Sequence, residues 1–198
     1  YRDFSRWQNR HILPGAVKSR EDYWLKEFQG EIPVLELPTD YPRPQVQAFE
    51  GFSRVIELSR QEIESLRAIA QKEDVTLFMV VLAIFNVFLA RLGGQEDIIV
   101  GTPTAGRNHA DLEQIMGMFV NTLALRNYPT EEKGFTEFLK EVKKQTLAAF
   151  DNQDYQFEDL VNRVLSDRDT GRNPLFDVMF SFRTLGAHSP GSMDAEES

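Results

Sequence analysis

Residues 76–107 read TLFMVVLAIFNVFLARLGGQEDIIVGTPTAGR, and this stretch decides the fold. Thr76 is a helix N-cap residue, and apolar side chains cover the whole circumference of the helix that we predict over residues 76–92. A Gly-Gly pair ends this helix, and the apolar run at 97–101 is typical of a strand buried on both faces. The pattern predicts a helix at the centre of its domain. The side chains that we expect to be almost inaccessible to solvent are Phe78, Val81, Leu82, Phe85 and Leu89.

The sequence on both sides of this stretch alternates between strand and helix patterns. Short apolar runs predict further strands, and apolar residues at three- and four-residue spacing predict further helices. This alternation predicts an α/β fold, with a mixed sheet and helices packed on it. The additional strands are predicted at 52–58, 118–125 and 175–182, and the additional helices at 19–29, 60–72, 135–150 and 159–165.

The two ends of the chain differ from its middle in composition. Residues 1–50 form a lead-in. Its three prolines within seven residues, at positions 38, 42 and 44, exclude a helix in that part and predict an extended connector. Residues 51–184 carry the regular patterns and form the lobe that holds the core. Residues 185–198 contain three acidic residues and no Lys or Arg, so we expect a disordered, polar, acidic tail.

The charge balance limits the classes of partner. The 198-residue chain has 22 Lys and Arg against 31 Asp and Glu, a formal net charge of −9. That balance argues against nucleic acid and against an anionic membrane surface, since both bind basic patches. The longest uncharged run, residues 75–90, is shorter than the roughly 20 residues of a bilayer span, so we expect no membrane segment.

Standard catalytic and metal-binding signatures are missing from the sequence. The chain has no cysteine, which excludes thiolate metal sites and is compatible with the cytoplasmic location that we expect. It contains no GxGxxG, GxxxxGK(S/T), GxSxG or HExxH motif. His11, His109 and His188 stand alone, without a second histidine at metal-binding spacing. We therefore expect no metal and no directly bound cofactor.

Four polar clusters combine hydrogen-bonding groups with residues that constrain the backbone. They are GTPTAGR at 101–107, GMFVNT at 117–122, NQDYQF at 152–157 and RDTGRNP at 168–174. The first cluster follows a buried strand, where ligand-binding loops commonly lie. Asn121 stands in an apolar strand, so its amide must be hydrogen-bonded, either to the scaffold or to a substrate.

Five segments together resemble the motifs of nonribosomal peptide synthetase condensation domains. YRDFSRW at 1–7 is similar to YxDFAxW, and LPTDYPRP at 37–44 matches the connector LPTDxPRP. IMGMFVNTLALR at 115–126 resembles IGxFVNTLxxR. NQDYQFE at 152–158 resembles HQDYPFE, with Gln where Pro is usual, and RDTGRNPL at 168–175 resembles RDxSRNPL. The order and the spacing agree over residues 1–184.

The resemblance implies an incomplete, chloramphenicol acetyltransferase-like lobe, mainly the C-terminal lobe of a condensation domain. Such a domain forms an amide bond between a donor acyl or peptidyl thioester and an acceptor aminoacyl thioester, both held on the phosphopantetheine of carrier proteins. The implied partners are peptidyl carrier protein domains, the adenylation domain of the same synthetase and the N-terminal lobe. The family's HHxxxDG motif is absent, so we expect the chain to be inactive alone.

The resemblance also assigns roles to residues. Asn121 would be a supporting catalytic residue, and Arg107 and Arg172 would contact either substrate or nearby acids. An epimerization domain and a non-catalytic carrier-protein docking module remain alternatives. The residues expected to line the substrate and pantetheine tunnel are Thr102, Thr104, Arg107, Gly117 and Phe119. The motif residues expected to be structural are Gln153, Asp154, Phe157, Arg172 and Asn173.

Overall fold

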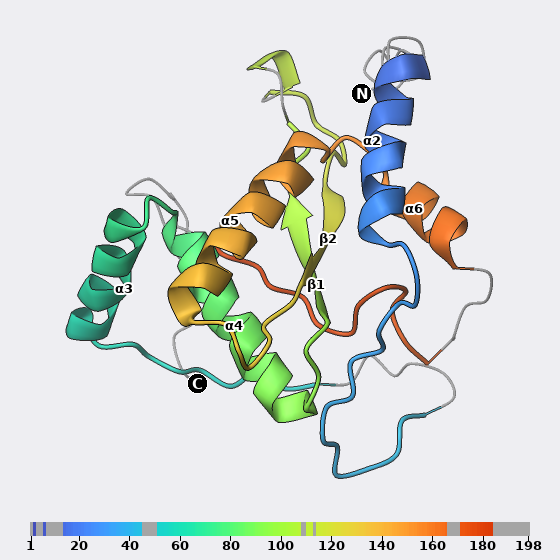
Figure 1. Cartoon of the computed structure of the whole chain (residues 1–198). Helices are drawn as coiled ribbons and strands as arrows, with labels where there is room; N and C mark the ends of the chain where they lie inside the picture. The colour runs from blue at the N-terminus through green and yellow to red at the C-terminus, as the bar shows by residue number, and fades with distance from the viewer. Residues whose placement is uncertain are drawn as a thin grey trace, which may run out of the picture.

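The chain folds into a small sheet with helices on both faces (Figure 1). This computed structural model describes residues 2, 6, 14–44, 51–107, 110–112, 114–165 and 171–183, and of residues 14–17 only the backbone. The elements in chain order are α2 (Pro14–Glu27), α3 (Arg60–Lys72), α4 (Leu77–Gly93), β1 (Ile98–Thr104), η1 (Ala110–Leu112), β2 (Asn121–Asn127), α5 (Phe135–Asp151) and α6 (Phe157–Val164).

The sheet is built on an antiparallel pair of strands. β1 and β2 pair from Ile98 opposite Asn127 to Thr104 opposite Asn121. An extended segment, residues 176–183, runs along the other side of β1 and forms a parallel bridge at Gly101. There the Gly101 amide donates to the Val178 carbonyl at 2.9 Å, and the Phe180 amide donates to the Gly101 carbonyl at 2.8 Å. The predicted α/β class is confirmed.

Two strand predictions need correction. The segment predicted as a strand at 175–182 pairs with β1 only at that single bridge and does not form a regular strand. The strand predicted at 52–58 is wrong, because these residues are extended but exposed, with Phe52 86% and Ile56 86% accessible. A strand needs a neighbour for its backbone groups, and no described segment pairs with residues 52–58.

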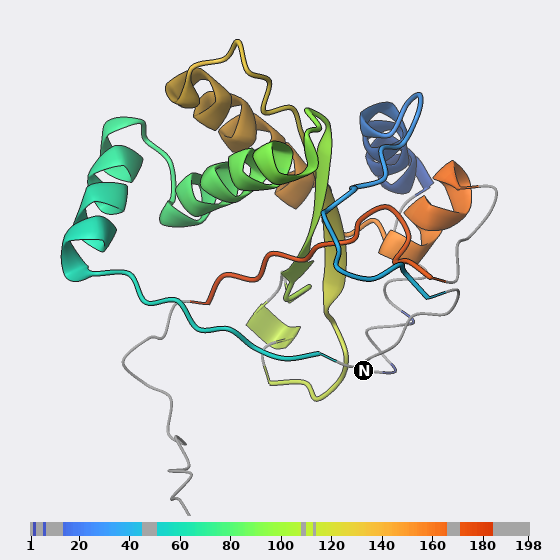
Figure 2. The ribbon, with the colours of Figure 1, turned by 90° about the horizontal axis from the view of Figure 1, so that it is seen from below.

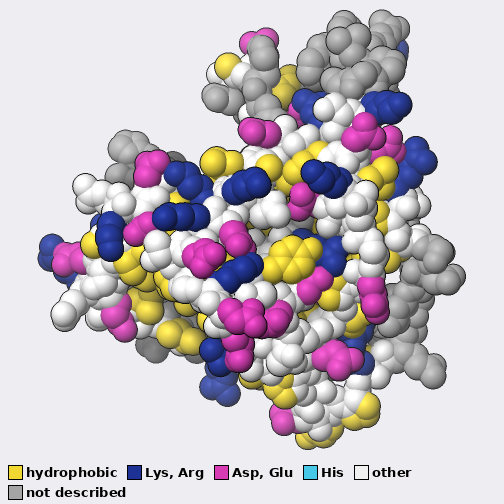
Figure 3. Space-filling view, viewed as in Figure 1, with side chains coloured by type: hydrophobic (Ala, Val, Ile, Leu, Met, Phe, Trp, Pro, Cys, Tyr) yellow, Lys and Arg dark blue, Asp and Glu magenta, His cyan; other side chains and the backbone are white. Residues whose placement is uncertain are grey.

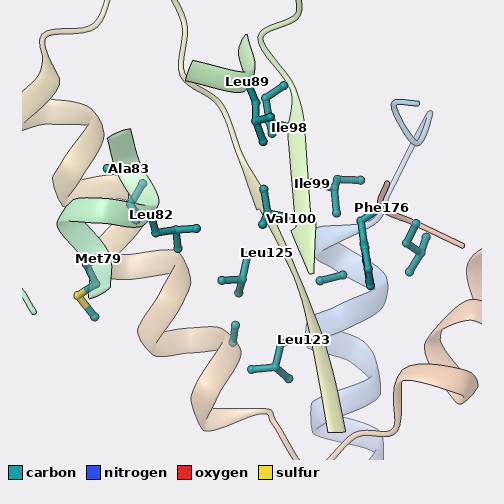
Figure 4. Close-up of a cluster of buried hydrophobic side chains, with 14 of the residues drawn as sticks. Met79, Leu82, Ala83, Leu89, Ile98, Ile99, Val100, Leu123, Leu125 and Phe176 are labelled. Carbon is teal, nitrogen blue, oxygen red and sulfur yellow. The ribbon is translucent and has the colours of Figure 1, made fainter. Parts of the chain in front are cut away.

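Helices cover the two faces of the sheet (Figure 2). α4 and α5 pack on one face, and α2 and α6 pack on the other. Figure 4 shows the resulting core: Leu123 and Leu125 of β2 point toward α4 and α5, whereas Ile99 and Phe176 lie on the opposite side of the strands. The strands are therefore buried on both faces, as the continuous apolar run of β1 predicts.

The ends of α4 follow the caps that its sequence predicts, but its burial is less complete than expected. The Thr76 hydroxyl accepts a hydrogen bond from the Met79 amide at 3.3 Å, and Gly94 ends the helix in the left-handed conformation with φ 64°. Leu82 and Leu89 are buried as predicted. The prediction is wrong for three side chains, which are only partly buried: Phe78, Val81 and Phe85.

The partial burial of α4 has a geometric cause. Ile84, Phe88 and Leu92 are spaced four residues apart, so they form one stripe along the helix. They are 41%, 56% and 44% exposed. Phe85 borders this stripe and is covered on one side by the Phe180 ring, whose centroid lies 5.6 Å away. α4 is thus buried on the sheet side and open along this stripe.

The surface carries charges of both signs. Figure 3 shows Lys and Arg side chains interspersed with Asp and Glu on the face seen in Figure 1. Several charged side chains of the protein are paired, for example Lys143 with Asp74 at 2.9 Å. Among the described residues no single helix is long and apolar enough to span a membrane; α3 and α4 together meet the length and composition test, but they are bent by 106° at their break.

Some expectations fall outside the described residues. These are the tail at 185–198, the three histidines His11, His109 and His188, and most of the YRDFSRW motif. Within the part of the chain that the structure describes, no group of three or more His, Cys, Asp or Glu side chains could hold a metal ion.

Candidate functional site at one end of the β1–β2 hairpin

Three of the polar clusters meet where β1 ends and β2 begins. Thr104, the last residue of β1, lies opposite Asn121, the first residue of β2. The Thr104 hydroxyl donates a hydrogen bond to the Gln153 side-chain carbonyl in the turn between α5 and α6. This bond holds the end of β1 against a turn that lies 49 residues further along the chain. We call this region the hairpin end, comprising residues 102–107, 117–122 and 152–157.

The side chain of Asn121 connects β2 to the turn at 152–157 through hydrogen bonds. Its side-chain amide nitrogen donates to the carbonyls of Gln153 and Tyr155, both at 2.8 Å. Its side-chain oxygen accepts from the Thr122 amide at 2.9 Å and from the Phe157 amide at 3.2 Å. An asparagine side chain offers two donors and two acceptor lone pairs, so these four bonds use its full capacity. The scaffold supplies all four partners.

Helix α2 supports the same turn from outside. Arg20 pairs with Asp154 at 2.8 Å, and the Trp24 indole donates to the Asn152 carbonyl at 3.0 Å. The Tyr155 hydroxyl lies 3.4 Å from Glu21, and burial, together with that carboxylate, raises the pKa of Tyr155. Because these contacts come from several side chains of one helix, the turn is fixed on the side facing away from the hairpin.

Phe157 begins α6 on the apolar side of the turn. Its ring centroid lies 5.4 Å from that of Phe176, so it packs α6 against the segment 176–183, which lies beside β1. The Phe176 ring in turn occupies the space in which Gly101 would place a Cβ atom, 2.5 Å away. The close approach of this segment to β1 therefore depends on a glycine at position 101.

Thr102 and Arg107 connect the hairpin end to the neighbouring backbone. The buried Thr102 hydroxyl donates to the Phe180 carbonyl at 2.9 Å. The Arg107 guanidinium lies 4.3 Å from the centroid of the Phe119 ring. It also donates to the carbonyls of three residues in the stretch ahead of β2, namely Leu112, Ile115 and Gly117. Gly117 itself is exposed, and Phe119 is buried.

Arg172 and Asn173 lie elsewhere. They border a cavity of about 580 Å³ that is also lined by Asp97 and Ile99, at the opposite end of β1 from Thr104. Arg172 pairs with Asp177 at 2.8 Å, and Arg43 reaches the other oxygen of that carboxylate at 3.3 Å. The structure therefore separates this cluster from the other three and gives its arginine an ion pair.

A buried ion pair at the far end of β2 was missed by sequence reasoning. Arg126, 7% exposed, contacts Asp97 at 2.6 Å and donates to the carbonyls of Glu27 at 3.2 Å and Glu31 at 2.9 Å. Hydrogen bonding to Asp97 favours the charged form and raises the pKa of Arg126. The available signal was an arginine directly after the apolar run Leu123–Leu125, since a charge at the end of a buried strand needs a partner.

The hairpin end offers hydroxyls, amides and one guanidinium, most of them already engaged with the scaffold. Such a set can shape a wall and present backbone groups to a neutral ligand.

A family model described as "Condensation domain" matches residues 1–198. The chain belongs to the condensation-domain family. It is 52% identical over 189 residues to tyrocidine synthase 3 of Brevibacillus parabrevis, which covers 96% of this chain and 3% of that protein. It is also 52% identical over 183 residues to surfactin synthase subunit 1 of Bacillus subtilis (strain 168), covering 92% and 5%. The chain thus spans a few per cent of these relatives.

Solved structures agree with this family and with the fold. A four-domain nonribosomal peptide synthetase bound to AMP and glycine superposes with a TM-score of 0.81 at 30% identity, over 85% of this chain and 13% of that one. The X-domain from teicoplanin biosynthesis superposes with a TM-score of 0.82 at 20% identity, over 89% and 40%, which speaks for the fold alone. The resemblance drawn from the five motifs is confirmed.

Proposed function

We propose that this chain is part of a condensation domain of a nonribosomal peptide synthetase and helps to form an amide bond between two carrier-bound substrates. Residues 51–184 would form most of its C-terminal lobe, with residues 1–50 as the connector from the lobe junction. Family membership over residues 1–198 is the observation that carries the proposal. The relatives named as synthases of tyrocidine and surfactin support a role in making peptide products.

The proposed chemistry is the aminolysis of a thioester. The acceptor amine attacks the donor carbonyl, the C–N bond forms, and the C–S bond breaks after a tetrahedral oxyanion has formed. The carrier thiol leaves with the proton that the amine gives up. Because aminolysis of a thioester is downhill, holding two tethered reactants in register supplies much of the acceleration. The remainder comes from keeping the amine neutral and stabilising the oxyanion.

The hairpin end would supply one wall of the tunnel in which the two pantetheine arms meet. Thr102, Thr104 and Arg107 would border the arm on one side, and Gly117 and Phe119 on the other. Asn121 acts in this proposal as a supporting residue, because its four hydrogen bonds hold the wall together. No cofactor is bound directly; phosphopantetheine arrives as part of the carrier-bound substrates.

The proposal includes partners and a location. Peptidyl carrier domains would deliver both substrates, an adenylation domain of the same synthetase would load the acceptor, and an N-terminal lobe would supply the HHxxxDG motif that is absent from the sequence. The cytoplasm is the proposed location, with which the lack of cysteine is compatible.

The test compares this chain with the complete domain. Donor- and acceptor-loaded carrier proteins are mixed with either protein, and the amide product is measured by mass spectrometry. The complete domain should form product, and residues 1–198 alone should give only background. Product formation by the chain alone would place the reacting base among its own residues. A complete domain that forms no product overturns the proposed function, and inversion of an aminoacyl thioester without amide formation would instead favour an epimerization domain.

A further inference from the structure

The stretch ahead of β2 is irregular, yet one side chain holds it in several places. Residues 114–119 form no helix or strand. Arg107 donates to the Ile115 carbonyl at 2.9 Å and to the Gly117 carbonyl at 3.4 Å, while its guanidinium covers the Phe119 ring at 4.3 Å. A planar guanidinium presents its N–H groups in a fixed fork and stacks on aromatic faces. A single side chain thereby fixes three successive odd-numbered positions of the stretch.

The residue before Arg107 permits this arrangement. Gly106 has φ +63°, and a Cβ atom there would lie 1.8 Å from the Phe119 carbonyl oxygen. Any other residue would collide with the backbone of the 114–119 stretch as well as being strained. The Gly106-Arg107 pair thus brings the end of β1 into direct contact with the chain that enters β2.

We call the contacts of Arg107 with residues 115, 117 and 119 the clamp. The stretch that it holds, residues 114–119, presents apolar side chains to solvent. Met116 is 92% exposed and Met118 is 81% exposed, whereas Phe119 between Met118 and β2 is buried under Arg107. Side chains at alternate positions of an extended chain point the same way, so the clamp faces inward and the methionines face outward. Besides the Arg107 bonds, the hydrogen bonds of Ile115 and Gly117 include one from the Ile115 amide to the Leu112 carbonyl, at 3.3 Å, and Arg107 also donates to that Leu112 carbonyl.

We propose that Arg107 is a positioning residue that acts through the 114–119 stretch, and that it does not bind the phosphate of the carrier's phosphopantetheine arm. This inference rests on the proposed function for its catalytic consequence. An arginine beside an arm that carries a phosphate is an obvious candidate for an ion pair with it. Here the guanidinium is half-buried and its two terminal nitrogens donate to three backbone carbonyls, so moving it to a phosphate would break these bonds and release the wall.

The first experiment uses residues 1–198 alone and does not depend on the proposed function. Amide hydrogen exchange is measured on the wild type and on Arg107→Ala. The amides of residues 114–119 should exchange at least tenfold faster in the variant, while those of α4 keep their rates. Arg91→Ala, which removes an arginine paired with Glu131 and 70% exposed, is the matched control and should change neither region. Unchanged exchange at residues 114–119 in Arg107→Ala would overturn the clamp.

The second experiment separates positioning from phosphate binding in the complete condensation domain. Amide formation is measured with acceptor aminoacyl thioesters of phosphopantetheine and of pantetheine, which lacks the phosphate. Arg107→Ala should lower kcat/KM about tenfold with both acceptors. Loss confined to the phosphate-bearing acceptor, or full activity with both, would overturn the proposal. If the wild-type domain is inactive with both acceptors, the proposed function fails, and so does the catalytic effect proposed for Arg107. The hydrogen-exchange experiment still tests whether Arg107 holds residues 114–119 in place.

A third comparison tests whether Arg107 acts through Phe119. Phe119→Leu keeps an apolar side chain but removes the ring face that the guanidinium covers. Phe119→Leu should lower kcat/KM in the same direction as Arg107→Ala, and the double variant should be no slower than the slower single variant. Additive losses would show that the two residues act separately and would contradict the proposed route. Arg107→Lys, which keeps the charge without the fork, should give an intermediate loss.

Discussion

The two ends of β2 are both polar and buried, but they are satisfied in different ways. At one end, Asn121 is neutral and gives its four hydrogen bonds to a strand neighbour and to the turn at 152–157. At the other end, Arg126 is charged and binds Asp97 and two carbonyls of the α2 region. The first end joins three of the polar clusters, two of which belong to family motifs, whereas the second joins β1 and β2 to the region of α2.

This difference between the two ends of β2 distinguishes a candidate functional site from a structural ion pair. Neutral groups that are fully paired can hold backbone segments in place without creating a charge that a thioester or an amine would meet. A buried charge must instead be matched where it stands, because an unpaired one is very costly. We therefore interpret the Asn121 end as the wall of the proposed tunnel and the Arg126 end as structural.

The largest expected effect is on the Arg126 end. Arg126→Ala leaves Asp97 and two carbonyls without their partner, and removing one member of a buried pair costs about 3–5 kcal/mol. Asp97 is 31% exposed, so we expect the lower part of that range. Chemical denaturation measures the loss. Arg91→Ala should cost less than about 1 kcal/mol, as is usual for exposed pairs. Equal losses of stability in Arg126→Ala and Arg91→Ala would show that the Arg126 ion pair does not stabilise the fold.

Asn121→Ala should have the next largest effect. The variant leaves the Gln153 and Tyr155 carbonyls and the Phe157 amide unpaired, at about 1–3 kcal/mol in unfolding free energy. Gln71→Ala, at an exposed position of α3, is the comparison and should stay within about 0.5 kcal/mol of the wild type. A wild-type unfolding midpoint for Asn121→Ala would mean that the four hydrogen bonds do not stabilise the fold.

Thr104→Val removes one hydroxyl from the same end. The change keeps the shape of the side chain and deletes the hydrogen bond to Gln153, so we expect a loss of about 1 kcal/mol. Because Gln153 is only partly buried, water can reach the freed carbonyl and limit the loss. The variant should therefore be clearly more stable than Asn121→Ala, and the reverse order would make Thr104 the main link to the turn.

The smallest expected effect is at Glu62 in α3, which lies at neither end of β2 and serves as a comparison for the two ends. The hydrogen bonds from Ser59 lower the pKa of Glu62 in the capping box of α3. A lowered folded pKa means that the contribution is present above the unfolded pKa and is lost as the pH falls through the folded pKa. Glu62→Gln should lower the unfolding midpoint slightly at pH 7 and not at pH 2. A difference that grows on acidification would contradict this.

The parts of the fold that local sequence dictates were predictable. The helix predicted at 135–150 is found as α5 at Phe135–Asp151, and the helix predicted at 60–72 is found as α3 at Arg60–Lys72, behind a capping box of Ser59 and Glu62. These features depend on residues three or four apart. The strand predicted at 52–58 was not formed, because strand formation depends on a distant partner that the sequence pattern does not reveal.

The candidate site was predictable in its residues but not in its contacts. The sequence singled out Asn121 and Gln153, which lie side by side. It also named Arg172, with Gln153, as a structural motif residue, and the structure puts Arg172 at the other end of β1. Nothing in the local pattern says that Gln153 faces Thr104, or that Arg126 reaches the carbonyls of Glu27 and Glu31. Contacts of that kind are set by the packing of α2 and of the α5–α6 turn on the hairpin.

The central claim, that the Asn121 end is the functional end of the hairpin, is tested most directly by the condensation rate per folded molecule. The complete domain is measured as wild type, Asn121→Ala and Asp97→Asn, each well below its unfolding transition and with the folded fraction determined in parallel. We predict that Asn121→Ala lowers the rate about tenfold, equivalent to about 1.4 kcal/mol in the barrier, and that Asp97→Asn keeps the wild-type rate. A wild-type rate for Asn121→Ala, or an equal loss for Asp97→Asn, would contradict the account.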